Sequence, residues 1–328
     1  GSVTIADAAT TGGVTFSTPA ADANYSAIAL VNGISGAPAA ASRRPPYLTS
    51  KTASGFTVNV EAAPGAGTSV DVDWAWVPNS PTGNGSFSGM RWFPFSGIAL
   101  FGQWGLPTLQ TGQATISGAS TLVTVTLATP ILLGAQSAIL ATTTSTSGAI
   151  PAGARRVSVN GTGIADQNEF GEGSTLRAIE FSLEAAPGVG NSTTFDWWCV
   201  PVHTLYNASA GAYSQLERGA LFRPRYYRFP RFMEFTEIKW PRDLATNGSP
   251  DYVILNSFTT ATSKDVTFGR TRPSSTFSVF SCGLMGANLV NAARYVNVTG
   301  KGTTGYTMNI EALPTGGTSQ GFYALVLP

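Results

Sequence analysis

The sequence predicts an all-β protein made of three repeated antiparallel β-sandwich units joined by aromatic-rich connecting segments. Three observations support this fold class. Charged residues make up only 11% of the 328 residues, which is too few for the polar faces of long amphipathic helices. Apolar and polar residues alternate with a period of two, as they do in half-buried strands. One short motif occurs three times, which indicates an internal repeat.

The repeated motif occupies residues 60–67, 183–190 and 310–317. Val-Glu-Ala-Ala-Pro-Gly-Ala-Gly in the first copy becomes Leu-Glu-Ala-Ala-Pro-Gly-Val-Gly and then Ile-Glu-Ala-Leu-Pro-Thr-Gly-Gly. Earlier in the copies, the Ser-Ala-Ile of residues 26–28 aligns with the same triplet at 137–139. The predicted parts of the chain are a unit at 1–85, an aromatic connection at 86–120, a unit at 121–203 with an inserted loop at 160–174, an Arg/aromatic connection at 204–264, and a unit at 265–328.

Each unit is expected to contain a half-buried strand, a hairpin turn and a closing strand. In the first unit Phe56 and Val58 alternate with polar neighbours, and the Pro-Gly-Ala-Gly of residues 64–67 supplies glycines for positive φ. Asp71 and Asp73 are expected on the solvated outer face of the closing strand. The inward positions of the three closing strands are expected to be Val72, Trp74, Trp76, Phe195, Trp197, Cys199, Phe322, Ala324 and Val326.

Composition excludes several classes of function. The net charge of +1 provides no general attraction to nucleic acid, and no apolar run is long enough for a membrane-spanning helix, so we expect no membrane insertion. The single histidine, His203, has no neighbouring nucleophile motif, and one histidine with two cysteines is too few for the usual zinc sites. We expect Cys199 and Cys282 to be buried free thiols, and we predict neither an enzyme nor a cofactor.

Several acidic residues are candidates for a metal-binding or catalytic site. Glu61, Glu184 and Glu311 recur in all three copies, which is compatible with a calcium site. We prefer a structural role in which these carboxylates accept hydrogen bonds from the amides of the following turn. A glycosidase would need two carboxylates on opposite sides of a substrate, and the pair Asp71 and Asp73 is better explained as a solvated strand face.

Partner contacts are predicted where the copies differ. The two connections are dense in aromatic residues, which should be buried against something. Five arginines between residues 218 and 231 also allow a single-stranded nucleic-acid site, but acids follow directly, so contact between subunits is preferred. The inserted loop carries three acids that form a weaker cation candidate. The candidate contact residues are Trp92, Trp104, Arg225, Tyr226, Tyr227, Arg228, Asp166, Glu169 and Glu172.

One family resemblance rests on the first copy. Residues 50–58 (Ser-Lys-Thr-Ala-Ser-Gly-Phe-Thr-Val) followed by 72–76 (Val-Asp-Trp-Ala-Trp) resemble the repeat of bacteriophage tail-fibre and other virion proteins, and are similar to H-type lectin domains. The resemblance extends over 14–78, 125–201 and 266–328, although the third copy has alanine in place of the first tryptophan. It implies six-stranded sandwiches that often form trimers, with carbohydrate or receptor binding in some members.

The expected function is therefore a structural or binding component of a phage virion, in a tail fibre, baseplate or receptor-binding assembly. The expected partners are copies of the chain in a homotrimer, other virion proteins, and a host glycan or receptor, whereas nucleic acid is not expected. Three repeats in one chain could instead form an internal pseudo-trimer. The alternative functions are a lectin-like carbohydrate-binding module outside a virion and, ranked last, a glycan-degrading tailspike.

Overall fold

Every strand pairing in the described part of the chain is antiparallel, and the two helices there are short 3-10 turns. This confirms the predicted all-β class. The computed structural model describes the following residues: 1–79, 91–92, 99–100, 110–132, 136–163, 166–167, 174–202, 206–207, 212–213, 253–258, 261–268, 275–283, 295–313 and 320–327.

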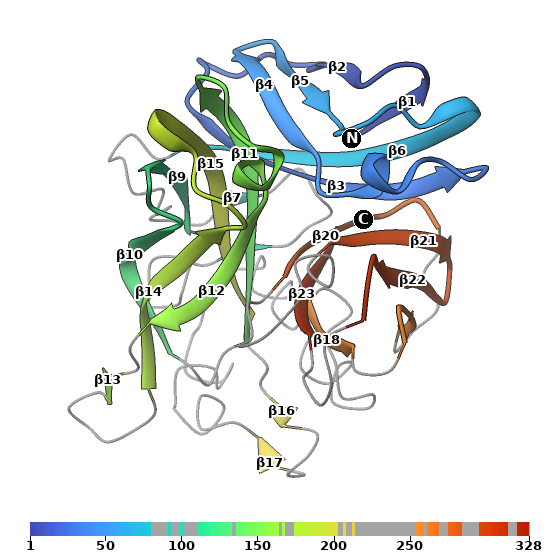
Figure 1. Cartoon of the computed structure of the whole chain (residues 1–328). Helices are drawn as coiled ribbons and strands as arrows, with labels where there is room; N and C mark the ends of the chain where they lie inside the picture. Colours follow the sequence, from blue (N-terminus) through green and yellow to red (C-terminus); the bar gives the residue numbers. More distant parts are fainter. Residues whose placement is uncertain are drawn as a thin grey trace.

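The first unit is a sandwich of two three-stranded sheets (Figure 1). Its inner sheet has the order β1-β6-β3 and its outer sheet the order β2-β5-β4. A 3-10 turn, η1 (Ala40–Arg43), precedes β4. The strands are β1 (Ser2–Asp7), β2 (Thr11–Thr15), β3 (Tyr25–Ser35), β4 (Tyr47–Thr52), β5 (Gly55–Asn59) and β6 (Gly65–Pro78).

The second unit repeats this topology. Its inner sheet has the order β9-β15-β11, its outer sheet the order β10-β14-β12, and the short β13 pairs with β14. The 3-10 turn η2 (Ala152–Arg155) precedes β12, as η1 precedes β4. The strands are β9 (Gln110–Gly118), β10 (Leu122–Leu132), β11 (Gln136–Ser147), β12 (Val157–Gly163), β13 (Asp166–Gln167), β14 (Ser174–Leu183) and β15 (Gly188–Val202).

The third unit has the same two sheets, with the inner order β18-β23-β20 and the outer order β19-β22-β21. Its strands are β18 (Val253–Phe258), β19 (Ser263–Thr267), β20 (Ser278–Gly283), β21 (Val296–Gly302), β22 (Gly305–Ile310) and β23 (Gln320–Leu327). Two further hairpins are β7 (Arg91–Trp92) with β8 (Ala99–Leu100), and β16 (Tyr206–Asn207) with β17 (Ala212–Tyr213).

Two strands of the sandwiches lie in segments that were predicted to be connections between the units. β9 falls within 86–120 and pairs with the closing strand β15, and β18 falls within 204–264 and pairs with the closing strand β23. Each supplies the strand that β1 supplies in the first unit. The second and third sandwiches therefore begin earlier in the chain than the motif alone indicates.

The hairpin turns of the first two units follow the sequence prediction. Gly65 and Gly67 have φ of 110° and 71°, and Gly188 and Gly190 have φ of 97° and 78°. These values lie in the left-handed region, which glycine enters without a Cβ clash. The Pro-Gly-x-Gly motif therefore determines where the closing strand starts in these two units.

The inner sheets are buried on both faces. In β6, Val70 and Val72 belong to the core of the first sandwich, and Trp74 packs against that core. Ala75 and Val77 point the other way and join a second core that contains residues of all three units. Each fully buried aliphatic side chain of valine size stabilises the fold by about 1.5–3 kcal/mol. The outward faces of the inner sheets therefore hold the units together.

The three units surround a pseudo-threefold axis. The strands β3, β11 and β20, which are equivalent in topology, contact one another pairwise. In addition β4 contacts β11, β12 contacts β20 and β21 contacts β3, so the fourth strand of each unit packs on the third strand of the next. Figure 1 shows the blue, green and red units arranged in this cyclic order.

Candidate functional site

A set of charged and polar side chains joins the three units. In each unit the acid lies one or two residues after the central strand of the outer sheet, which is β5, β14 or β22. The donor of each unit lies just before the equivalent strands β4, β12 and β21. We call this set the axial ring, and its members are Arg44, Glu61, Arg156, Glu184, Tyr295 and Glu311.

The two arginines of the axial ring each bind carboxylates of two units. Arg156 donates to both oxygens of Glu61, with Nε and Nη2 each 2.5 Å from the carboxylate, and its Nη1 lies 2.6 Å from Glu184. Arg44 holds Glu311 through Nε at 2.7 Å and Nη2 at 2.6 Å, and approaches Glu61 at 3.3 Å. Two-pronged arginine–carboxylate pairs combine strength with a fixed geometry.

Tyr295 replaces the third arginine. Its hydroxyl donates to Glu184 and accepts from Arg156. The guanidinium carbons of Arg44 and Arg156 lie 5.1 and 4.7 Å from the centre of its ring, within cation–π range. Burial, together with the hydrogen bond to Glu184, raises the pKa of the Tyr295 hydroxyl above its ordinary value. The neutral phenol is therefore maintained as a donor.

The structural role predicted for the three recurring glutamates holds, and the structure adds partners that the sequence did not predict. Their carboxylates bind arginine and tyrosine side chains, mostly of other units. Each carboxylate of the axial ring is thus engaged by a donor. Among the residues that the structure describes, no cluster of three His, Cys, Asp or Glu side chains could hold a metal ion.

A lysine–aspartate bridge crosses two of the interfaces. Nζ of Lys51 in the first unit lies 2.6 Å from Oδ2 of Asp196 in the second, and Nζ of Lys301 in the third lies 2.9 Å from Oδ2 of Asp73 in the first. Asp196 is completely buried and also accepts from the amide of Ala27 at 2.8 Å. Burial raises its pKa, while the lysine and the amide act in the opposite direction.

The prediction that Asp73 lies on a solvated face is wrong. Asp73 and Asp196 are buried, at 4% and 0% exposure, because the outward face of each closing strand is an interface between units. The signal was present in the sequence. Outward neighbours of these aspartates include Ala75, Val77 and Trp198, which are buried too. A strand with apolar residues on both faces indicates burial on both sides.

The third interface lacks this bridge. The Val-Asn-Gly-Thr of residues 159–162 aligns with the Val-Thr-Gly-Lys of residues 298–301, so Thr162 occupies the position of the lysine. In the third unit Tyr323 pairs with Cys282 across the strands, and in the first unit Asp73 pairs with Leu30 at the equivalent position. Tyr323 therefore occupies the position of the aspartate. Lysine and aspartate are therefore both missing at the interface between the second and third units. The two positions change together because they serve one contact.

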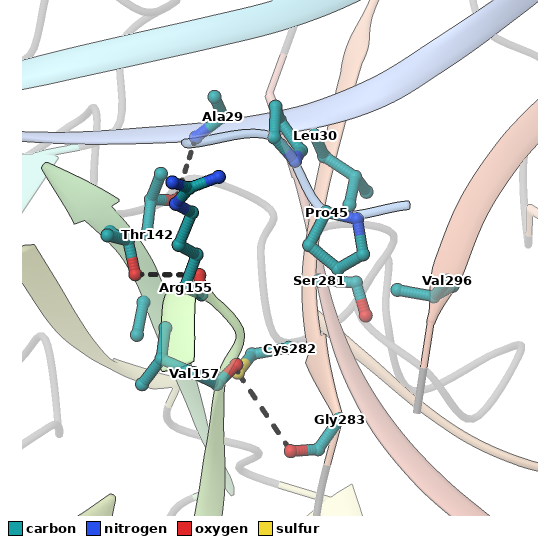
Figure 2. A pocket seen from close by; sticks show the side chains of 13 residues that line it. Ala29, Leu30, Pro45, Thr142, Arg155, Val157, Ser281, Cys282, Gly283 and Val296 are labelled. Atoms are coloured by element: carbon teal, nitrogen blue, oxygen red, sulfur yellow. Dashed lines mark hydrogen bonds between the residues drawn. The ribbon is translucent and has the colours of Figure 1, made fainter. Parts of the chain in front are cut away.

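A cavity of about 20 Å³ lies where the three units meet (Figure 2). Ala29 and Leu30 of β3, Thr142 of β11 and Ser281 of β20 are among its lining residues, and Arg155 from η2 also lines it. Nε of Arg155 is buried and has no hydrogen-bond partner in the described part of the chain. The cavity therefore contains a donor that its own walls do not satisfy.

None of the nine partner-contact residues predicted from the sequence has a side chain in the described part, so these predictions stay open. Trp92 lies in β7 and Asp166 in β13, and their side chains are outside the described part. Outside it altogether are His203 and the candidates Trp104, Glu169, Glu172, Arg225, Tyr226, Tyr227 and Arg228. The described residues include no helix long and apolar enough to cross a membrane.

The prediction for the cysteines is confirmed. Cys199 and Cys282 are buried thiols that form no disulfide. Comparisons with protein-family models, curated proteins and solved structures find no match to this chain. The resemblance to tail-fibre repeats and H-type lectins therefore stays a prediction.

Proposed function

We propose that the chain is a structural component of a phage virion, in a tail fibre, baseplate or receptor-binding assembly. One observation carries this proposal. Side chains that recur between the copies, namely the glutamates of the axial ring and the lysine–aspartate pairs, are used to lock the units to one another. The repeated positions thus maintain a shape, which is what a particle component has to do.

The proposed action is geometric. Bridges such as Lys51 with Asp196 cross between units at buried positions, and removal of one partner would leave an uncompensated charge. Relative rotation of the units would break several such contacts together. We infer a rigid body whose contacts with other virion proteins and with a host receptor or glycan use positions at which the copies differ, among them the candidate residues of the inserted loop and of the two connections.

Composition analysis of the particle tests the proposal. Virions of the virus that encodes the chain are purified and analysed by peptide mass spectrometry and by immunogold electron microscopy. We expect the chain in the particle, with label at the tail. A non-structural protein of the same genome is the control and should be absent. Absence of the chain from purified virions, or a gene located outside any viral genome, would overturn the proposal.

A further inference from the structure

The cavity on the pseudo-threefold axis has a positive lining. Thirteen residues line it, and among them Arg155 is the one charged residue, with no Asp or Glu. The neighbouring Arg44 and Arg156 form ion pairs, whereas Arg155 has no carboxylate partner in the described part of the chain. Its guanidinium stacks on the ring of Tyr47 at 5.0 Å, which does not satisfy its N–H groups.

A hydrogen bond to the main chain of Arg155 fixes the position of this residue. The hydroxyl of Thr143 donates to the carbonyl of Arg155 at 2.9 Å, which fixes the end of η2 on β11. The side chain of Arg155 then lies beside Thr142 and Ala29, as Figure 2 shows. Arg155 is therefore positioned by the second unit and lines a space that residues of the first and third units also line.

A second donor faces the same space. Oγ1 of Thr142 accepts a hydrogen bond from the amide of Ala29 at 3.1 Å, so the hydroxyl proton of Thr142 remains available to an occupant. Thr142 is 3% exposed. Two residues with donor groups, one of them cationic, thus line one small volume, and a buried donor without a partner, such as Nε of Arg155, is costly.

We propose that this cavity binds one small monovalent anion of the size of chloride. A volume of about 20 Å³ accommodates one water-sized occupant, which favours chloride over the larger phosphate or sulfate. An anion accepts hydrogen bonds from both Arg155 and Thr142, and it also compensates the charge of the guanidinium. A water molecule would accept the same hydrogen bonds but would carry no charge opposite to that of the guanidinium.

Salt-dependent melting of the intact protein tests the site. The melting temperature is measured in sodium chloride and in sodium gluconate at equal ionic strength. We expect a rise of roughly 2–4 °C at a chloride concentration of about a hundred times its Kd, growing further with the logarithm of that concentration, and no such rise in gluconate. The variant Arg155→Met should lose this difference between the two salts. Equal melting curves of the wild-type protein in the two salts would overturn the proposal.

Arg43→Met is the matched control, since Arg43 stands in the last turn of η1 as Arg155 stands in that of η2. Arg43 does not line the cavity, so this variant should keep the response to chloride. Crystals of the wild-type protein grown in sodium bromide provide a test that needs no variant. An anomalous peak within hydrogen-bond distance of Nε of Arg155 is expected, and a water without anomalous signal would overturn the proposal.

Discussion

Nζ of Lys51 lies 2.6 Å from Oδ2 of Asp196, although the two residues are 145 positions apart and belong to different units. The same carboxylate accepts hydrogen bonds from the Ala27 amide and the Gln113 side chain. It is therefore a buried charge whose partners come from both sides of one interface. Removal of such a charge lowers the free energy of unfolding, because its buried partners are left without a compensating interaction.

The variant Asp196→Ala should lower the free energy of unfolding by about 3–5 kcal/mol, because the ammonium of Lys51 would remain part-buried without a counter-charge. Urea denaturation measures this loss. Asp71→Ala is the matched control, since Asp71 lies on a closing strand too but accepts from the exposed Thr4 hydroxyl. Its cost should be about 1 kcal/mol or less. Equal losses for the two variants would contradict the interpretation.

Glu61 should contribute more to stability than Glu311. The side chain of Glu61 is 8% exposed and binds arginines of two units, whereas that of Glu311 is 26% exposed and binds one. We expect Glu61→Gln to cost about 3 kcal/mol and Glu311→Gln about 1 kcal/mol. A double-mutant cycle of Glu61→Gln with Arg156→Met should show coupling. Additive losses would argue against a direct contact.

Alkaline stability should depend on Tyr25. Burial, and secondarily the charge of Asp196, raises the pKa of Tyr25 to about 12 from an ordinary value of 10. A raised pKa in the folded state means that the stabilisation is complete below pH 10 and is lost as the pH rises through 12. The variant Tyr25→Phe should therefore lose less stability than the wild type between these pH values. Parallel decline of the two proteins would contradict this.

The thiols should be unreactive in the folded protein. Burial raises the pKa of Cys282 to about 12, and Cys199 is also buried. Because the thiolate is the nucleophile, an aromatic disulfide reagent at pH 8 should detect no thiol in the native state. In denaturant it should detect two thiols per chain. Rapid reaction of the native protein would show that these residues are accessible.

The solution mass should be that of one chain, 34.1 kDa. The contacts by which separate sandwiches would assemble around a threefold axis are made here within one chain, from β4 to β11, β12 to β20 and β21 to β3. Light scattering measures the mass directly. Three times this value would instead support the homotrimer that the family resemblance implies.

The strand register of the second unit differs from the one that the sequence repeat indicates. The sequence aligns residues 26–28 with 137–139, but in the structure residue 26 is equivalent to residue 138. Ser26 pairs with Val77, and the equivalent Val200 pairs with Ala138 rather than with Ser137. A slip of one residue exchanges the two faces of a strand. Both faces of β11 bury apolar residues, so its alternation could not reveal the slip.

The all-β class, the repeat, the inward-facing strand positions and the glycine turns of the first two units could be predicted from the sequence, because these features depend on alternation and on backbone conformation within a few residues. The role of the outward acids depends on how the three units pack. Arg44 and Glu311 are 267 positions apart, and Asp73 meets a lysine of another unit. A carboxylate on a strand looks the same in sequence whether water or a lysine faces it, so the packing of the three units determined its partner.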